Sequence, residues 1–131
     1  MEVKIKPYRK RYEQALMDMI LLEGDQWSCY SSDQNKDLYI LSLEKSITYL
    51  IFENDELAGY ARALEDFGFY IYICDLLVTP KHRGKGYGNL LMRHIQGKYP
   101  TFDTYVMSDV DDYYIKRGYL KEGSIFLLPK R

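Results

Sequence analysis

The sequence lacks an excess of basic residues, a dense set of cysteines and any long apolar run. Its 18 Lys and Arg against 19 Asp and Glu give a net charge of −1, whereas nucleic-acid binding needs a clear excess of positive charge. Two cysteines are too few for a disulfide scaffold, and two histidines without clustered cysteines indicate no metal site. No window reaches the ~18 apolar residues of a membrane span, and no apolar stretch of signal-peptide length opens the chain. We therefore expect a cytoplasmic protein without nucleic-acid, membrane or metal partners.

The length of 131 residues predicts one domain over 1–131, large enough for a real hydrophobic core. Hydrophobic residues at 47% and charged residues at 28% are ordinary for a folded chain. The 14 tyrosines are unusual, and we expect most of them to be half-buried on strands or to line a groove. Cys74 lies inside an apolar run and is expected to be a buried thiol.

Hydrophobic periodicity and turn residues predict the order β-α-α-β-β-β-α-β-α-β. Strands are expected over 3–7, 46–53, 57–64, 69–78 and 101–107, with a last strand or two within 119–129. Helices are expected over 9–22, after a cap at Ser32 or Asp33, over 86–96 and over 110–117. Asn54-Asp55 suits a tight hairpin turn. Runs of consecutive strands predict an α+β fold with a mixed sheet rather than a doubly wound one.

A glycine-rich loop, "RGKGYG" (83–88), separates an apolar strand from a helix. The first turn of a helix has free N–H groups and the positive end of the helix dipole, and anions bind there. Glycines let a phosphate approach the backbone closely. Five cations and no acid lie between residues 81 and 98, namely Lys81, Arg83, Lys85, Arg93 and Lys98. The segment therefore predicts a phosphate cradle.

Other classes of glycine loop fit the segment less well. A P-loop needs G-x-x-x-x-G-K-[ST], which the segment lacks. A dinucleotide site needs G-x-G-x-x-G after the first strand of a βαβ unit, and here Asn89 stands where the third glycine should be. A glycine turn without a ligand would not require the flanking cations.

The segment "VTPKHRGKGYGNLL" resembles the acetyl-CoA signature of the GCN5-related N-acetyltransferases, [Q/R]-x-x-G-x-[G/A], with Arg83, Gly86 and Gly88 at the fixed positions. The later segment "DYYIKRGY" (112–119) is similar to the second signature of that family. The predicted order of elements also matches the family along nearly the whole chain. The resemblance implies a mixed, mostly antiparallel sheet that is splayed in the middle and flanked by helices.

The resemblance further implies acetyl-CoA as the acetyl donor. Its diphosphate would lie on the N–H groups of the loop, with Arg83 nearby; these groups belong to Gly84, Lys85, Gly86, Tyr87, Gly88 and Asn89. The family's central strand carries a bulge, which would fall near Leu76 and Leu77. Free backbone groups there would bind the pantetheine arm and polarise the thioester carbonyl, as assigned to Leu76, Leu77 and Val78. Ser108 stands near the position where many relatives carry an asparagine that contacts this arm.

Two residues are candidates for catalysis. Tyr114 occupies the place of the family tyrosine that protonates the departing thiolate; the alternative is one more buried tyrosine. Asp75 is the only charged residue from Phe67 to Val78, and it is a candidate general base for the amine. The alternative for Asp75 is a structural carboxylate that is paired with a cation or bonded to backbone N–H groups. Cys74 is a weaker candidate for an acyl-carrying nucleophile, because nothing in the sequence lowers its pKa.

The acceptor is expected to contact the segment "LLEGDQWSCYSSDQ", where Glu23, Asp25, Trp27 and Tyr30 would suit a cationic amine. The alternative is a solvated loop that Trp27 anchors to the core. A small molecule, a peptide N-terminus and a protein lysine all remain open as acceptors. Of the histidines, His82 is expected to be solvated in the loop and His94 to be half-buried.

The predicted function is acetyl transfer from acetyl-CoA to a primary amine by direct attack in a ternary complex. A non-catalytic module that binds CoA or acyl-CoA is the alternative. An interaction domain is a third hypothesis, because the apolar last strand could pair with a partner or with a second copy in a homodimer.

Overall fold

The computed structural model describes residues 1–130 and contains one five-stranded sheet, in the order β1-β2-β3-β4-β5. The strands are β1 (Val3–Pro7), β2 (Ile47–Glu53), β3 (Glu56–Glu65), β4 (Tyr70–Val78) and β5 (Asp103–Val106). The helices are α1 (Glu13–Leu22), α2 (Ser28–Ser31), α3 (Lys36–Lys45), α4 (Tyr87–Lys98) and α5 (Asp111–Lys116), with 3₁₀ turns at Lys10–Tyr12, Gly24–Trp27 and Pro80–His82. Neighbouring strands from β1 to β4 are antiparallel, and β5 is parallel to β4. The predicted α+β fold with a mixed, mostly antiparallel sheet is confirmed.

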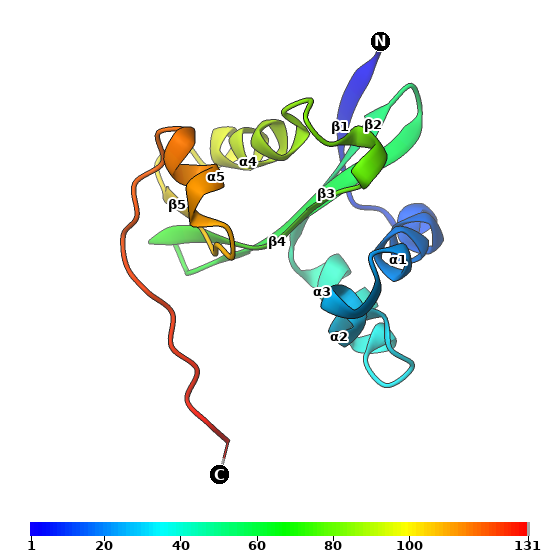
Figure 1. The fold of residues 1–131 in the computed structure, drawn as a ribbon, viewed down its shortest axis with the longest axis horizontal. Coiled ribbons are helices and arrows are strands. Elements are labelled where there is room, and N and C mark those ends of the chain that lie inside the picture. Colours follow the sequence, from blue (N-terminus) through cyan, green and yellow to red (C-terminus); the bar gives the residue numbers. More distant parts are fainter. Residues whose placement is uncertain (131) are drawn as a thin grey trace.

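Helices cover both faces of the sheet. Helices α4 and α5 lie on one side, and α1, α2 and α3 lie on the other (Figure 1). Each side has its own buried cluster: one includes Leu16, Ile20, Leu43, Leu50 and Tyr60, and the other includes Ile71, Ile73, Leu91 and Ile95. The strands are buried on both faces where the helices cover them, which explains the nearly continuous apolar runs of β2 and β4.

The hairpin between β2 and β3 forms as predicted. Asn54 and Asp55 both have positive φ angles, of 49° and 67°. Asn and Asp adopt this conformation more readily than other residues with side chains, and it matches the twist of the two strands. The turn brings Glu53 and Glu56 to one end of the sheet, where they are register partners.

The sheet opens between β4 and β5. Pairing of these strands runs from Tyr70 opposite Asp103 to Ile73 opposite Val106 and then stops, while β4 stays paired with β3 up to Val78. On the β3 side, Ala63 faces Ile73 and Arg62 faces Asp75, so that Cys74 is an extra residue. The expected bulge therefore lies at Cys74 and not near Leu76 and Leu77. It lies one residue beyond Ile73, the last residue of β4 that pairs with β5.

The strand predicted within 119–129 does not form in the described part of the chain, because 119–130 contains neither helix nor strand. This segment instead runs away from the sheet (Figure 1). The apolar side chains of Ile125, Phe126, Leu127 and Leu128 are 64–91% exposed. Its first half borders a groove of about 1080 Å³ beside α4 and β5. An apolar run favours a strand, but a strand forms only where the segment pairs with a neighbouring strand, and residues 119–130 pair with none of β1 to β5. The homodimer, in which the last strand would pair with a second copy of the chain, stays a prediction.

Residues 1–130 contain neither a candidate membrane-spanning helix nor a candidate metal site. No helix there combines the length and hydropathy of a membrane span. No group of three or more His, Cys, Asp or Glu side chains is arranged to hold a metal ion.

Candidate functional site

The glycine loop ends at the N-terminus of α4, where a row of backbone N–H groups is free. Within residues 1–130, the N–H groups from Gly84 through Asn89 donate no hydrogen bond, and Leu90 is the next donor, to the Gly86 oxygen at 3.0 Å. These donors lie at the positive end of a helix of 12 residues. Consecutive free donors at a helix N-terminus form a binding site for an anion.

Glycines have two different roles in this loop. Gly84 and Gly86 have φ angles of +81°, a conformation that side chains disfavour, and space is open around both. Gly88 lies inside the helix and packs closely: a Cβ there would lie 3.2 Å from the Tyr113 hydroxyl and 3.6 Å from Leu76. Gly88 therefore lets α4 approach α5 and β4, in addition to any contact with a ligand.

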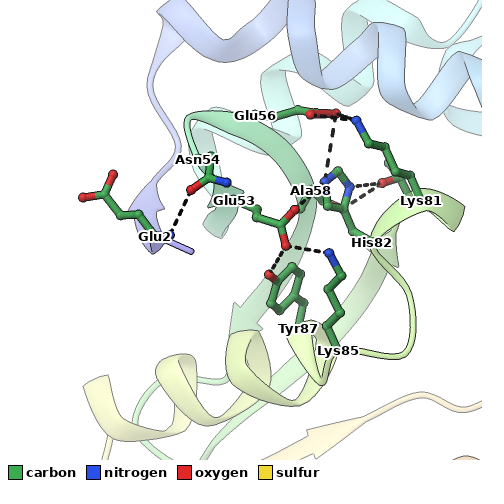
Figure 2. A network of polar contacts seen from close by, with 10 residues as sticks. Glu2, Glu53, Asn54, Glu56, Ala58, Lys81, His82, Lys85 and Tyr87 are labelled. Carbon is green, nitrogen blue, oxygen red and sulfur yellow. Dashed lines mark hydrogen bonds and ion pairs between the residues drawn. The ribbon is translucent and has the colours of Figure 1, made fainter.

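Three cations of the loop are paired with acids from distant parts of the sequence. Lys81 contacts Glu56 at 2.9 Å, and Lys85 contacts Glu53 at 2.7 Å (Figure 2). Arg83 donates to the Val78 carbonyl at 2.8 Å and to the Glu23 carboxylate at 3.2 Å. The positive charge concentrated in residues 81–98 is thus partly neutralised in the folded chain. Arg83 and Glu23, which were assigned to the cofactor and the acceptor, contact each other.

His82 is buried, and the prediction of a solvated loop residue is wrong. Its side chain is 1% exposed, and its Nδ1 lies 2.9 Å from the Thr79 hydroxyl. Its Nε2 lies 3.4 Å from a Glu53 oxygen, without a hydrogen-bond partner in the described structure. Nothing in the local sequence indicates this burial, because the β2–β3 turn, which covers His82, lies some distance away in the chain. His94 is half-buried against Tyr49, with ring centroids 4.7 Å apart.

Asp75 is buried and accepts hydrogen bonds from three side chains. Its Oδ2 lies 2.5 Å from Arg62 Nε and 2.7 Å from the Tyr39 hydroxyl, and its Oδ1 accepts from the Tyr30 hydroxyl at 2.9 Å. The hydroxyls of Tyr39 and Tyr60 are 2.5 Å apart, which extends the network into the core. Asp75 is therefore paired with a cation, as one of the two alternatives expected. This pairing does not test its predicted role as a base.

Burial raises the pKa of the tyrosines in this network. Desolvation raises the pKa of Tyr30, Tyr39 and Tyr60, and the nearby charge of Asp75 adds to the effect. These phenols therefore stay protonated and can keep donating hydrogen bonds to the carboxylate throughout the physiological pH range.

A cavity of about 150 Å³ lies where β4 and β5 separate, and it brings together residues that are far apart in the sequence. It is lined by Trp27, Cys74, Asp75, Leu76 and Tyr114, together with Ile73, Val106, Met107, Asp109 and Val110. The pKa of Tyr114 is raised to about 12. Burial is the largest cause, and the nearby Tyr113 and Tyr119 add to it. Burial also raises the pKa of the Cys74 thiol, which keeps it protonated and makes it a poor nucleophile.

Comparison with known proteins decides the family. The model of the acetyltransferase (GNAT) family matches residues 12–117, which is most of the chain. The chain belongs to the GNAT acetyltransferase family. It is 33% identical over 84 residues to the uncharacterized N-acetyltransferase ycf52 of Porphyra purpurea, a match that covers 58% of this chain and 48% of that protein. The match to the ycf52 protein of Pyropia yezoensis covers 42% of that protein. The chain therefore spans about half the length of the curated relatives it matches.

Solved GNAT structures have the same fold. The chain superposes on an aminoglycoside acetyltransferase from an uncultured soil metagenomic sample with a TM-score of 0.75, at 20% identity and over 100% of both chains. It superposes equally well, at 0.75, on AAC(6')-Iy in complex with a bisubstrate analogue, CoA-S-monomethyl-acetylneamine, at 12% identity over 100% of this chain and 99% of the other.

Other predicted site residues of this GNAT chain lie around the cavity rather than in it. Tyr30 reaches the site through Asp75. The Ser108 hydroxyl accepts from the Val110 N–H at 3.0 Å, and Ser108 lines the larger groove together with Tyr114. The side chain of Leu77 is buried in the core cluster opposite α4. The Asn89 side chain accepts a hydrogen bond from the Tyr119 hydroxyl, which ties α4 to the segment after α5.

Sequence reasoning missed Arg62, Tyr39, Tyr60 and Glu53. Arg62 had a signal like that of Asp75, since it is the only charged residue within the apolar run from Leu57 to Leu64. Two isolated charges of opposite sign on adjacent predicted strands would have suggested the ion pair. The tyrosines had no such signal among the 14 in the chain.

Proposed function

We propose that this chain is an N-acetyltransferase that moves an acetyl group from acetyl-CoA to a primary amine by direct attack in a ternary complex. The observation that carries the proposal is the row of free N–H groups from Gly84 through Asn89, at the positive end of α4. A diphosphate matches it, because such a ligand carries the negative charge and the many acceptor oxygens that the row can bind.

The residues around the opening of the sheet fit the remainder of acetyl-CoA. Beyond Ile73, β4 has no pairing with β5, so that backbone groups on this side of Leu76 and Val78 are available to a pantetheine arm. We assign Leu77 to the same contact with the pantetheine arm. Ser108, which lies shortly before α5, would also contact the arm. The Val78 carbonyl accepts from Arg83 in this structure, and Arg83 would have to turn toward the diphosphate to free it.

Tyr114 is proposed as the general acid that protonates the sulfur as the thioester breaks. With a pKa raised to about 12, its hydroxyl carries the proton at neutral pH. A free thiol has a pKa near ~8.5, and the desolvation that raises the pKa of the phenol would also raise that of a thiol released in the same cavity. The proton therefore passes from the Tyr114 oxygen to sulfur where both are withdrawn from water.

Asp75 is proposed to accept the proton that the amine loses. Its carboxylate lines the cavity, where its oxygens would lie within reach of an amine that enters from the acceptor side. The hydroxyl of Tyr30, which donates to Asp75, would place the amine next to the carboxylate. The base of this reaction is then held by the same network that anchors β4 to β3.

The acceptor is proposed to be a cationic amine that contacts Glu23, Trp27 and Tyr30. Trp27 lines the cavity, and its ring centroid lies 5.7 Å from that of Tyr30, so the two present aromatic faces to an incoming cation. AAC(6')-Iy was solved with an analogue that joins CoA to an acetylated neamine. Small molecules, peptide N-termini and protein lysines all belong to the class to be tested.

The deciding experiment measures release of free CoA thiol from acetyl-CoA with a panel of amines and peptides, beside calorimetry with CoA alone. Thiol release that depends on an amine, and that Tyr114→Phe slows, supports the proposal. CoA binding without thiol release for any acceptor would favour the alternative, a non-catalytic module that binds CoA. Absence of CoA binding would contradict both.

A further inference from the structure

One carboxylate, that of Glu53 at the end of β2, contacts two side chains of the glycine loop and lies close to His82, which precedes the loop. Its Oε1 accepts from Lys85 Nζ at 2.7 Å and from the Tyr87 hydroxyl at 2.5 Å. Its Oε2 lies 3.4 Å from His82 Nε2. Figure 2 shows these groups converging on Glu53 from one side.

The Glu53 carboxylate is largely shielded from water. The Glu53 side chain is 11% exposed and that of His82 is 1% exposed, while that of Lys85 is 36% exposed. The rings of His82 and Tyr87 are nearly stacked, with centroids 6.4 Å apart. By contrast, the pair formed by Lys81 and Glu56 is 70% and 52% exposed, although it joins the same hairpin to the same loop. Shielded charged contacts are screened less than exposed ones, so we expect the Glu53 contacts to restrain the loop more strongly.

The loop needs such a restraint, because its own backbone supplies little. Backbone bonds from His82 to Thr79 and from Arg83 to Pro80 close the turn before the loop. In the described structure, the next backbone donor is Leu90. Gly84 and Gly86 lie between these hydrogen bonds. Glycine has more conformational freedom in the unfolded chain than any other residue, so that ordering these two positions costs the most entropy. Apart from the Leu90 N–H bond to the Gly86 oxygen, side-chain contacts hold this stretch, and the polar contacts of Lys85 and Tyr87 both end on Glu53.

We propose that Glu53 is the positioning residue of the anion-binding loop: its carboxylate holds Lys85 and Tyr87, beside the buried His82, so that the N–H groups of residues 84–89 converge on one diphosphate. The inference rests on the proposed function in taking CoA as the source of that diphosphate. The ordering of the loop by Glu53 is a property of the chain without any ligand.

The sign of the effect separates positioning from simple electrostatics. A carboxylate near a site for a dianion repels the ligand, so removing its charge would tighten binding if charge alone mattered. If Glu53 acts by holding the loop, its removal must weaken binding in spite of the relieved repulsion. Residues that orient metal ligands contribute about 10- to 100-fold to metal affinity, and we take the lower end of that scale for the orientation of this loop.

The test compares Glu53→Ala, Glu53→Gln and the matched control Glu56→Ala. Amide hydrogen exchange of Arg83 and Leu90, the hydrogen-bonded donors on either side of residues 84–89, is measured on each protein without ligand, and calorimetry is done with CoA and with pantetheine, which lacks the diphosphate. For Glu53→Ala we expect about tenfold faster exchange and about tenfold weaker CoA binding, with unchanged pantetheine binding. Glu53→Gln keeps an acceptor for Tyr87 and should lose less, and Glu56→Ala should stay within about twofold of the unmodified protein.

Each outcome is decisive. Unchanged exchange in Glu53→Ala, or tighter CoA binding in Glu53→Gln, overturns the proposal, as does equal weakening of CoA and pantetheine. If the unmodified chain binds no CoA while Glu53→Ala still speeds exchange, the proposed function fails and the ordering of the loop by Glu53 stands. If Glu53→Ala does not fold, Lys85→Ala and Tyr87→Phe, which remove the loop side of the same contacts, must reproduce the faster exchange.

Discussion

Arg62 and Asp75 form an ion pair across neighbouring strands, with 2.5 Å between Nε and Oδ2 and with side chains only 13% and 2% exposed. They are register partners in β3 and β4, directly beside the extra residue Cys74. The pair thus fixes β4 at the point where it leaves β5 and where the cavity begins. It links the stability of the sheet to the geometry of the candidate site.

Removing the cation should therefore destabilise the fold. Arg62→Ala leaves the Asp75 carboxylate buried without its partner, and we expect the free energy of unfolding to fall by about 3 kcal/mol. Tyr39→Phe removes one neutral donor to the same carboxylate and should cost about 1 kcal/mol. Urea unfolding of the two variants measures both values. A smaller loss for Arg62→Ala than for Tyr39→Phe would contradict this ranking.

Tyr114→Phe should lower the turnover rate by about 100-fold, the scale of general acid catalysis, with little change in CoA affinity. Steady-state kinetics and calorimetry separate the two quantities. Because the pKa of Tyr114 is raised to about 12, its ionisation should not reduce the rate between neutral pH and ~10. Tyr113→Phe is the neighbouring control and should retain most of the rate. A full rate in Tyr114→Phe would remove this residue from the mechanism.

Alkaline pH should destabilise the chain through the buried tyrosines. The folded-state pKa values of Tyr30, Tyr39 and Tyr60 are raised above the ordinary value near ~10. The folded state therefore binds more protons than the unfolded state above that pH, and stability is full below ~10 and falls as pH rises further. Urea unfolding from about pH 9 to about pH 11 measures the slope. Tyr30→Phe should make it shallower, and an unchanged slope would contradict the contribution of Tyr30.

Gly86→Val should weaken CoA binding, because a branched side chain is strained at the φ of +81° and this strain would shift the backbone of the loop. We expect a loss of about tenfold or more, comparable with other displaced binding groups. Gly97→Ala is the control in the same helix: no atom lies within 4 Å of the added Cβ, and its φ is not positive. Calorimetry should show unchanged CoA affinity for Gly97→Ala. Equal affinities for both variants would count against the cradle.

The sequence alone determined the main features of the sheet and the loop. Period-two and period-3.6 patterns fixed most strands and helices to within a few residues, since burial of one face imposes these periods locally. Asn54-Asp55 and the spaced glycines fixed two turns, because backbone conformation depends on the residues at the turn itself. The signature residues Arg83, Gly86 and Gly88 indicated the family that the comparison then showed.

Tertiary structure alone decided the contacts between segments far apart in the chain. The pairing of Asp75 with Arg62, of Lys85 with Glu53 and of Arg83 with Glu23, and the burial of His82, depend on which strands and turns become neighbours. The absence of a strand within 119–130 has the same origin. Local patterns record which side chains avoid water, whereas hydrogen bonds and ion pairs need partners whose positions only the assembled fold defines.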